Sequence, residues 1–66
     1  FDRRQLTRAF AHLDPKDRVL LTLHHYLQMP VAESAQLLGL PEGTVRSRVH
    51  HALKRLRACY DAEVRR

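Results

Sequence analysis

The chain has 66 residues, of which 44% are hydrophobic and 29% charged. Because so short a chain buries only about 60% of the surface that it exposes when unfolded, the sequence predicts one small domain and excludes a roomy enzyme pocket. The formal net charge of +5 favours an anionic partner such as nucleic acid, although a basic surface that only keeps a protein soluble has the same charge.

A first helix is predicted over residues 3–12. Asp2 followed by Gln5 resembles a capping box, in which the Asp carboxylate accepts from an early backbone N–H and the Gln side chain reaches back to the N-cap N–H. The apolar residues recur every three or four positions, which places them on one face of the helix: Leu6, Ala9, Phe10 and Leu13.

A second helix is predicted over residues 15–27. Asp14 suits the N-cap, Pro15 the first helical position, and Asp17 the positive first turn. The apolar stripe is wide enough to be covered on more than one side: Val19, Leu20, Leu23, Tyr26 and Leu27. The helix should end at residues 28–30, because the residue before a proline is pushed out of the helical conformation.

A third helix is predicted over residues 31–38, ending at Gly39, which suits a left-handed position after a helix. A fourth helix should begin at Pro41 and cover residues 41–60, and the final "EVRR" is expected to be a frayed tail. The apolar seam of the fourth helix steps by three and four: Val45, Val49, Ala52, Leu53, Leu56 and Tyr60. Since no stretch alternates as a strand does, the predicted fold class is all-α, a single four-helix domain over residues 1–66.

The third helix, the glycine turn and the fourth helix have the layout of a helix-turn-helix without a wing. With the apolar seam facing the core, the opposite side of the fourth helix carries donors that suit base edges and phosphates. These residues are Arg46, Ser47, His50, His51 and Lys54, flanked by Arg48, Arg55 and Arg57. The same pattern fits a surface helix kept soluble by charge, so both interpretations stand on the pattern alone.

The start of the fourth helix is a second, independent feature. Thr44 lies beside backbone N–H groups that the helix itself leaves unpaired, and such groups bind phosphate. Glu42 suits the helix dipole and could also accept from a cytosine amino group.

The segment "RVLLTLHHYLQMPVAESAQLLGLPEGTVRSRVHHALKRLR" resembles region 4 of bacterial sigma factors, in particular the extracytoplasmic-function (ECF) group. The motif "EGTVRSR" is similar to the recognition-helix signature of that family, and the likeness extends from about Leu6 to Arg57. The resemblance implies the promoter-binding end of a longer alternative sigma factor, and the start at Phe1 rather than Met fits a piece of a longer protein. It would recognise the −35 promoter element and dock on the β flap of RNA polymerase.

The resemblance also implies roles for individual residues. The base-reading positions of the family fall on Arg46, Ser47, His50 and His51. The positions that hold the DNA backbone fall on Thr44, Arg48 and the amides around Glu42 and Gly43, and Lys54 and Arg55 complete the predicted backbone contacts.

Two positions depart from the family pattern. Ser34 stands where a large aliphatic residue is common, which predicts looser packing of the third helix. His51 stands where a basic residue often follows the signature, directly after His50. Because imidazole changes charge between about pH 5 and 8, the reading surface is expected to vary with pH.

The first two helices offer more apolar surface than so small a core is able to cover, which predicts a site for an amphipathic partner helix. The candidate residues are Leu6, Phe10, Leu13, Leu20, Leu23 and Leu27. By resemblance the partner would be the polymerase flap or an anti-sigma factor. Alternatively all six are core residues. A pure interaction module and a helix-turn-helix domain of another transcription regulator are the competing functions.

Other classes of site find little support in the sequence. The adjacent pairs His24–His25 and His50–His51 do not face each other on a helix, so no metal site and no cofactor are predicted. The single cysteine, Cys59, is expected to be a small buried hydrophobe. No catalytic constellation is present, so neither an enzymatic activity nor a small-molecule substrate is predicted. No apolar run reaches the length of a membrane span, and the cytoplasm is the expected compartment.

Overall fold

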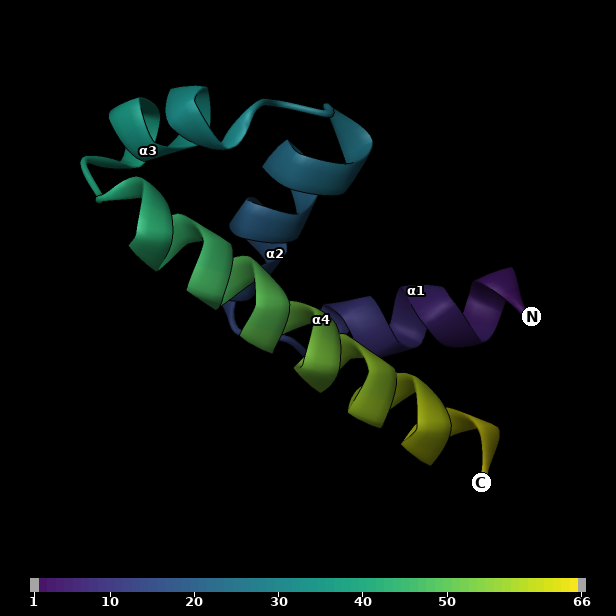
Figure 1. Ribbon diagram of the computed structural model, residues 1–66. Coiled ribbons are helices and arrows are strands. Elements are labelled where there is room, and N and C mark those ends of the chain that lie inside the picture. Colours follow the sequence, from purple (N-terminus) through teal and green to yellow (C-terminus); the bar gives the residue numbers. More distant parts are fainter. Residues whose placement is uncertain (1, 66) are drawn as a thin grey trace.

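The computed structural model describes residues 2–65 of the chain. Within these residues the chain forms four α-helices and one π-helical turn, arranged as shown in Figure 1. The elements are α1 (Arg3–Ala11), α2 (Pro15–Leu21), the π-helical turn η1 (Thr22–Tyr26), α3 (Val31–Leu38) and α4 (Glu42–Val64). The all-α fold class is confirmed.

Helix α4 is the central element of the domain, and α1, α2 and α3 all pack against it (Figure 1). Its 23 residues account for most of the longest dimension of the domain, 39 Å. The core is a small cluster in which the side chains of α4 meet those of α2, α3 and the α1–α2 connection: Leu13, Leu20, Leu21, Ala35, Val45, Val49 and Ala52. The middle of α4 therefore supplies the part of the core that all the other helices share.

The predicted helix ends are largely confirmed by local geometry. Gly39 adopts the left-handed conformation with φ 67°, and the N–H of Leu40 donates to the carbonyl of Ala35 at 2.9 Å, which closes α3. Pro41 is the N-cap of α4 rather than its first helical residue. Asp2 caps α1 by accepting from the N–H of Arg4 at 2.8 Å.

The second half of the predicted capping box is not formed. The Gln5 side chain was expected to accept a hydrogen bond from the backbone N–H of Asp2. That N–H donates instead to the hydroxyl of Tyr60 at 3.1 Å. A residue of α4 thus takes the place of the local partner, because α1 packs along the last turns of that helix.

The second helix departs from the prediction at its C-terminal end. It is α-helical only to Leu21 and then widens into η1, where the N–H of Leu27 donates to the carbonyl of Thr22, five residues back, at 2.9 Å. The hydroxyl of Thr22 donates to the carbonyl of Arg18 at 2.7 Å, a back-bonding contact of the kind that bends helices. Gln28 ends the segment in a left-handed conformation, with φ 51°.

The wide apolar stripe of the second helix is covered on one side only. Leu20 is buried, as is Leu21, which the sequence analysis did not single out, with 4% and 3% of their surfaces exposed. Val19, Tyr26 and Leu27 remain 49%, 83% and 57% exposed, so the expectation that the stripe is covered on several sides is wrong for these residues. Within residues 2–65 no further helix packs over this side of the segment.

The fourth helix is longer than predicted, and the C-terminal segment is not a frayed tail where the structure describes it. Helix α4 continues to Val64, and Glu63 is only 7% exposed. Its Oε1 lies 3.4 Å from the Nε2 of His12 at the end of α1. The packing of α1 thus supports the last turns of α4. Leu53, predicted to lie in the buried seam, is at its edge with 37% exposed.

The core assignment of Leu20 predicts a large loss of stability on truncation. Leu20→Ala should lower the free energy of unfolding by about 2–5 kcal/mol, because it removes a buried side chain from a core too small to close over the cavity. The exposed Leu27, substituted as Leu27→Ala, should change it by no more than about 0.5 kcal/mol. Urea unfolding followed by circular dichroism measures both, and equal effects would contradict the assigned core.

Candidate nucleic-acid interface

The orientation of α4 is decided by its buried residues. Val45 and Val49 are 1% and 7% exposed and hold one side of the helix against α2 and α3. Because a helix turns 100° per residue, Ser47 lies opposite both anchors, whereas Arg46 and His50 directly follow an anchor and project from the flank of the helix. All four predicted base-reading residues are exposed, and all four lie in the first three turns of α4: Arg46, Ser47, His50 and His51.

The first turn of α4 lies at the surface. Gly43 is exposed, and no atom lies within 4 Å of the position that a Cβ would occupy. Glu42 lies in the same turn, and its carboxylate Oε1 lies 3.4 Å from a guanidinium nitrogen of Arg46. Both side chains are more than half exposed, so this contact is weak and readily exchanged for another partner. The unbound domain thus holds Arg46 near the start of the helix.

Two neighbouring histidine rings extend the exposed face. The ring centroids of His50 and His51 lie 5.7 Å apart and the rings are tilted by 60°. The two side chains therefore point to different parts of the exposed surface, as expected for adjacent helical residues.

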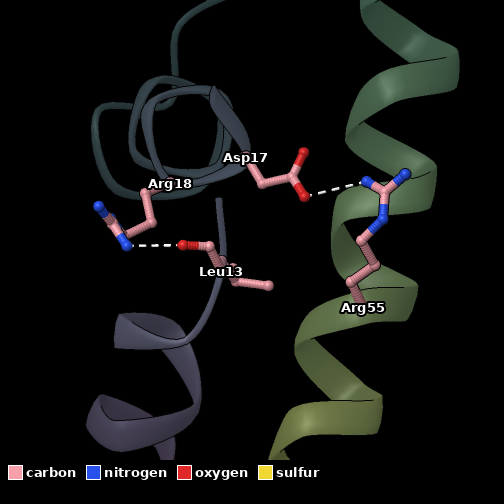
Figure 2. Close-up of polar contacts among 4 residues, drawn as sticks. All are labelled: Leu13, Asp17, Arg18 and Arg55. Carbon is pink, nitrogen blue, oxygen red and sulfur yellow. Dashed lines mark hydrogen bonds and ion pairs between the residues drawn. The ribbon is translucent and has the colours of Figure 1, made fainter. Parts of the chain in front are cut away.

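The predicted backbone-contacting residues differ in how exposed they are and in whether they already contact another residue of the domain. Arg48 and Lys54 are exposed and Thr44 is half-buried. Arg55 is also mostly exposed, but one of its guanidinium nitrogens donates to the carboxylate of Asp17 at 2.9 Å. Figure 2 shows this contact bridging from the first turn of α2 to α4.

Asp17 has a different role from the one that its position in the helix predicts. Only 7% of its surface is exposed, and it points across to α4 rather than serving only the dipole of its own helix. A buried carboxylate without a partner is costly, so Arg55 compensates a charge that the fold has taken out of water. The pair thereby fixes the position of α2 along α4.

Arg18 ties α1 to α2. Its guanidinium donates to the carbonyl of Ala11, at the end of α1, at 3.1 Å. It also donates to the carbonyl of Leu13, in the connection to α2, at 2.6 Å (Figure 2 shows the Leu13 contact). These carbonyls have no partner within their own helix end, so the cation satisfies them and favours the sharp turn between the helices. The sequence analysis did not assign this role to Arg18.

An apolar groove of about 690 Å³ lies on another side of the domain, between α1, η1 and α4. Its lining is almost entirely hydrocarbon or aromatic: Leu6, Thr7, Phe10, Leu21, Thr22, His25, Tyr26, Leu53 and Leu56. Leu6 and Phe10 of the predicted partner surface lie in this groove, whereas Leu23 and Leu27 lie outside its lining. Leu13 and Leu20 are 5% and 4% exposed and belong to the core, so the alternative interpretation holds for these two.

Residues 3–56 match the family described as "Sigma-70, region 4". The chain belongs to this family. The match includes α1, α2, η1, α3 and the first half of α4, and it therefore contains both the helix-turn-helix and the apolar groove of this sigma region 4 domain.

Known sigma factors are similar to this region 4 domain over 56 residues, or 85% of the chain. An "RNA polymerase sigma-E factor" from Streptomyces antibioticus is 46% identical, and the protein of the same name from Streptomyces coelicolor is 45% identical. An "ECF RNA polymerase sigma factor SigL" from Mycobacterium tuberculosis is 38% identical. The chain spans about a third of the length of these relatives, with matches over 31%, 32% and 32% of them. Of these three relatives, the Mycobacterium tuberculosis protein is the one whose name puts it in the ECF group.

Among residues 2–65 of the sigma domain, no group of three or more His, Cys, Asp or Glu side chains is placed to hold a metal ion. The rings of His24 and His25 are edge to face, with centroids 4.9 Å apart, and Cys59 is half-buried. None of the described helices is long and apolar enough to cross a membrane.

The pairing of Arg55 with a buried carboxylate predicts that Arg55 contributes to stability, independently of any DNA contact. Arg55→Ala should lower the free energy of unfolding by about 1–2 kcal/mol, less than for a fully buried pair because the guanidinium is largely in solvent. The neighbouring exposed cation, substituted as Lys54→Ala, should change it by less than about 0.5 kcal/mol. Thermal unfolding without DNA measures both, and a stable Arg55→Ala domain would show that the pair does not hold α2 to α4.

Proposed function

We propose that this domain binds the −35 element of promoters as the C-terminal part of an ECF sigma factor and so directs RNA polymerase to its start sites. The observation that carries the proposal is the orientation of α4, in which buried Val45 and Val49 leave the polar residues of the "RSR" half of the "EGTVRSR" segment, at positions 46–48, in solvent. The names of the relatives, which are RNA polymerase sigma factors, support the same function.

In this proposal the first half of α4 enters the major groove, and its exposed residues divide into two kinds of contact. Arg46, Ser47, His50 and His51 meet base edges, and Arg46 exchanges its weak contact with Glu42 for acceptors on a base. Thr44, Arg48, Lys54 and Arg55 hold phosphates, together with the backbone around Glu42 and Gly43. Arg55 can do so while bound to Asp17, because a guanidinium has five N–H donors and the side chain is 57% exposed.

The apolar groove supports a second proposed contact, with an amphipathic helix of the polymerase β flap or of an anti-sigma factor. The groove opens between α1, η1 and α4, away from the exposed residues at the start of α4. Its aromatic and aliphatic lining suits the apolar face of a helix. The residues that carry this contact are Leu6 and Phe10 from the predicted surface, joined by Tyr26 and Leu53.

The domain works by binding and carries out no catalysis of its own in this proposal, and it acts in the cytoplasm, where transcription takes place. A region 4 domain on its own would bind DNA weakly. Tethering to polymerase and to the rest of a longer sigma factor raises the effective concentration of the reading helix at its site. A helix-turn-helix regulator that acts without polymerase is the main competing function.

The two kinds of DNA contact predict different mutant behaviour. Arg46→Ala should cost about 1–3 kcal/mol of binding free energy on the preferred −35 sequence and relax base choice at one position. Lys54→Ala should weaken binding to all sequences alike and flatten the dependence on salt. Selection of promoter sequences by holoenzyme reconstituted with each variant measures both effects. If Arg46→Ala left the discrimination between promoter sequences unchanged, Arg46 would not read a base. Sequence-selective binding in the absence of polymerase would favour a stand-alone regulator.

The groove predicts a site for a partner that leaves the DNA face free. Tyr26→Ala should weaken binding of a β-flap-tip peptide by about 1–2 kcal/mol, or roughly five- to thirtyfold, because an exposed aromatic at the edge of an apolar groove is a typical anchor. Leu37→Ala is the matched control, since Leu37 is 65% exposed on α3 and outside the groove. Fluorescence anisotropy of the labelled peptide measures the affinities. Displacement of the peptide by promoter DNA would contradict the proposal that the peptide and the DNA bind at two separate sites.

A further inference from the structure

Lys16, in the first turn of α2, lies beside Arg48 of α4 although the two residues are far apart in the sequence. Two adjoining hollows bring them together, and each hollow is lined by both residues. The larger one, of about 390 Å³, has a mostly apolar lining that includes Val19, Leu20 and Leu40. Lys16 and Arg48 are the exposed cations of its lining. The sequence analysis gave Lys16 no role.

The charges around the smaller hollow leave the two exposed cations available to an anion. Its lining contains three cations, Lys16, Arg48 and Arg55, and two carboxylates, Asp14 and Asp17. Asp17 is buried and paired with Arg55 at 2.9 Å, so these two charges largely cancel. Asp14 is exposed, and its side chain makes no capping hydrogen bond to α2. It is therefore the one acidic group that would oppose an anion here.

The edge of α4 that meets α2 carries three of the predicted DNA-backbone contacts. Thr44, Arg48 and Arg55 are spaced by four and seven residues, so they follow one line along the helix. Lys16 stands beside that line on a different element. A nucleic-acid strand that runs past Arg48 would therefore meet a second cation from α2.

We propose that the first turn of α2 is part of the DNA-binding surface, with Lys16 contacting a backbone phosphate next to the one held by Arg48. This inference rests on the proposed function of the domain. Lys16 contributes affinity without base preference, because it can reach only the phosphate backbone. Asp14 opposes the same phosphate, so its removal strengthens binding.

The test measures promoter binding by holoenzyme reconstituted with the sigma factor that carries this domain, over a range of salt concentrations. Each phosphate contact contributes about 0.9 to the slope of log K against log salt concentration. Lys16→Gln should lower the slope by about 0.9 and the affinity roughly three- to tenfold at physiological salt, with unchanged base selectivity. Lys16→Arg should keep the slope, and Asp14→Asn should raise the affinity, since Asn is as good an N-cap as Asp.

Arg3→Gln is the matched control, because it removes one positive charge from an exposed residue at the far end of α1. An equal effect of Lys16→Gln and Arg3→Gln would overturn the proposal, since it would reflect net charge alone. An unchanged slope for Lys16→Gln, with the wild-type holoenzyme still selective for its −35 element, would overturn the Lys16 contact and leave the proposed function standing. Loss of selectivity in the wild type itself would overturn both.

Discussion

The packing of one seam of α4 against all the other helices is the constraint on which the rest of this domain depends. Val45, Val49 and Ala52 are almost completely buried, and the three other α-helices all pack against this helix. A domain of 66 residues has no second layer in which to build a separate core. The buried seam therefore determines at once how α1, α2 and α3 are placed and which side of α4 remains in solvent.

The length of α4 allows it to serve two surfaces. Its first half carries the exposed residues assigned to DNA, and its second half packs against α1, where Tyr60 accepts from the N–H of Asp2 and Glu63 meets His12. The apolar groove lies near the middle, where Leu53 and Leu56 line it together with residues of α1 and η1. In our proposal DNA and polymerase therefore contact different parts of the same helix.

Ionic contacts refine this arrangement. The pair of Asp17 and Arg55 fixes α2 against α4, and Arg18 closes the connection between α1 and α2 (Figure 2). Each places a cation against an oxygen that the fold has removed from water, so its value lies in specifying one arrangement more than in added stability. Lys16, in the first turn of α2, lines the same hollow as this pair and Arg48 of α4.

The sequence by itself determined the helices, the left-handed turn at Gly39 and the side of α4 that stays exposed, because these follow from local conformational preferences and from the spacing of apolar residues. Only the tertiary structure decided which apolar residues of the second helix are core and which are surface: Leu21 is buried whereas Tyr26 is exposed. It also decided that α4 extends to Val64 and that Asp17 pairs with Arg55. The physical reason is the same in each case. These outcomes depend on which surface a neighbouring helix covers and which partner groups it provides, and that helix is distant in the sequence.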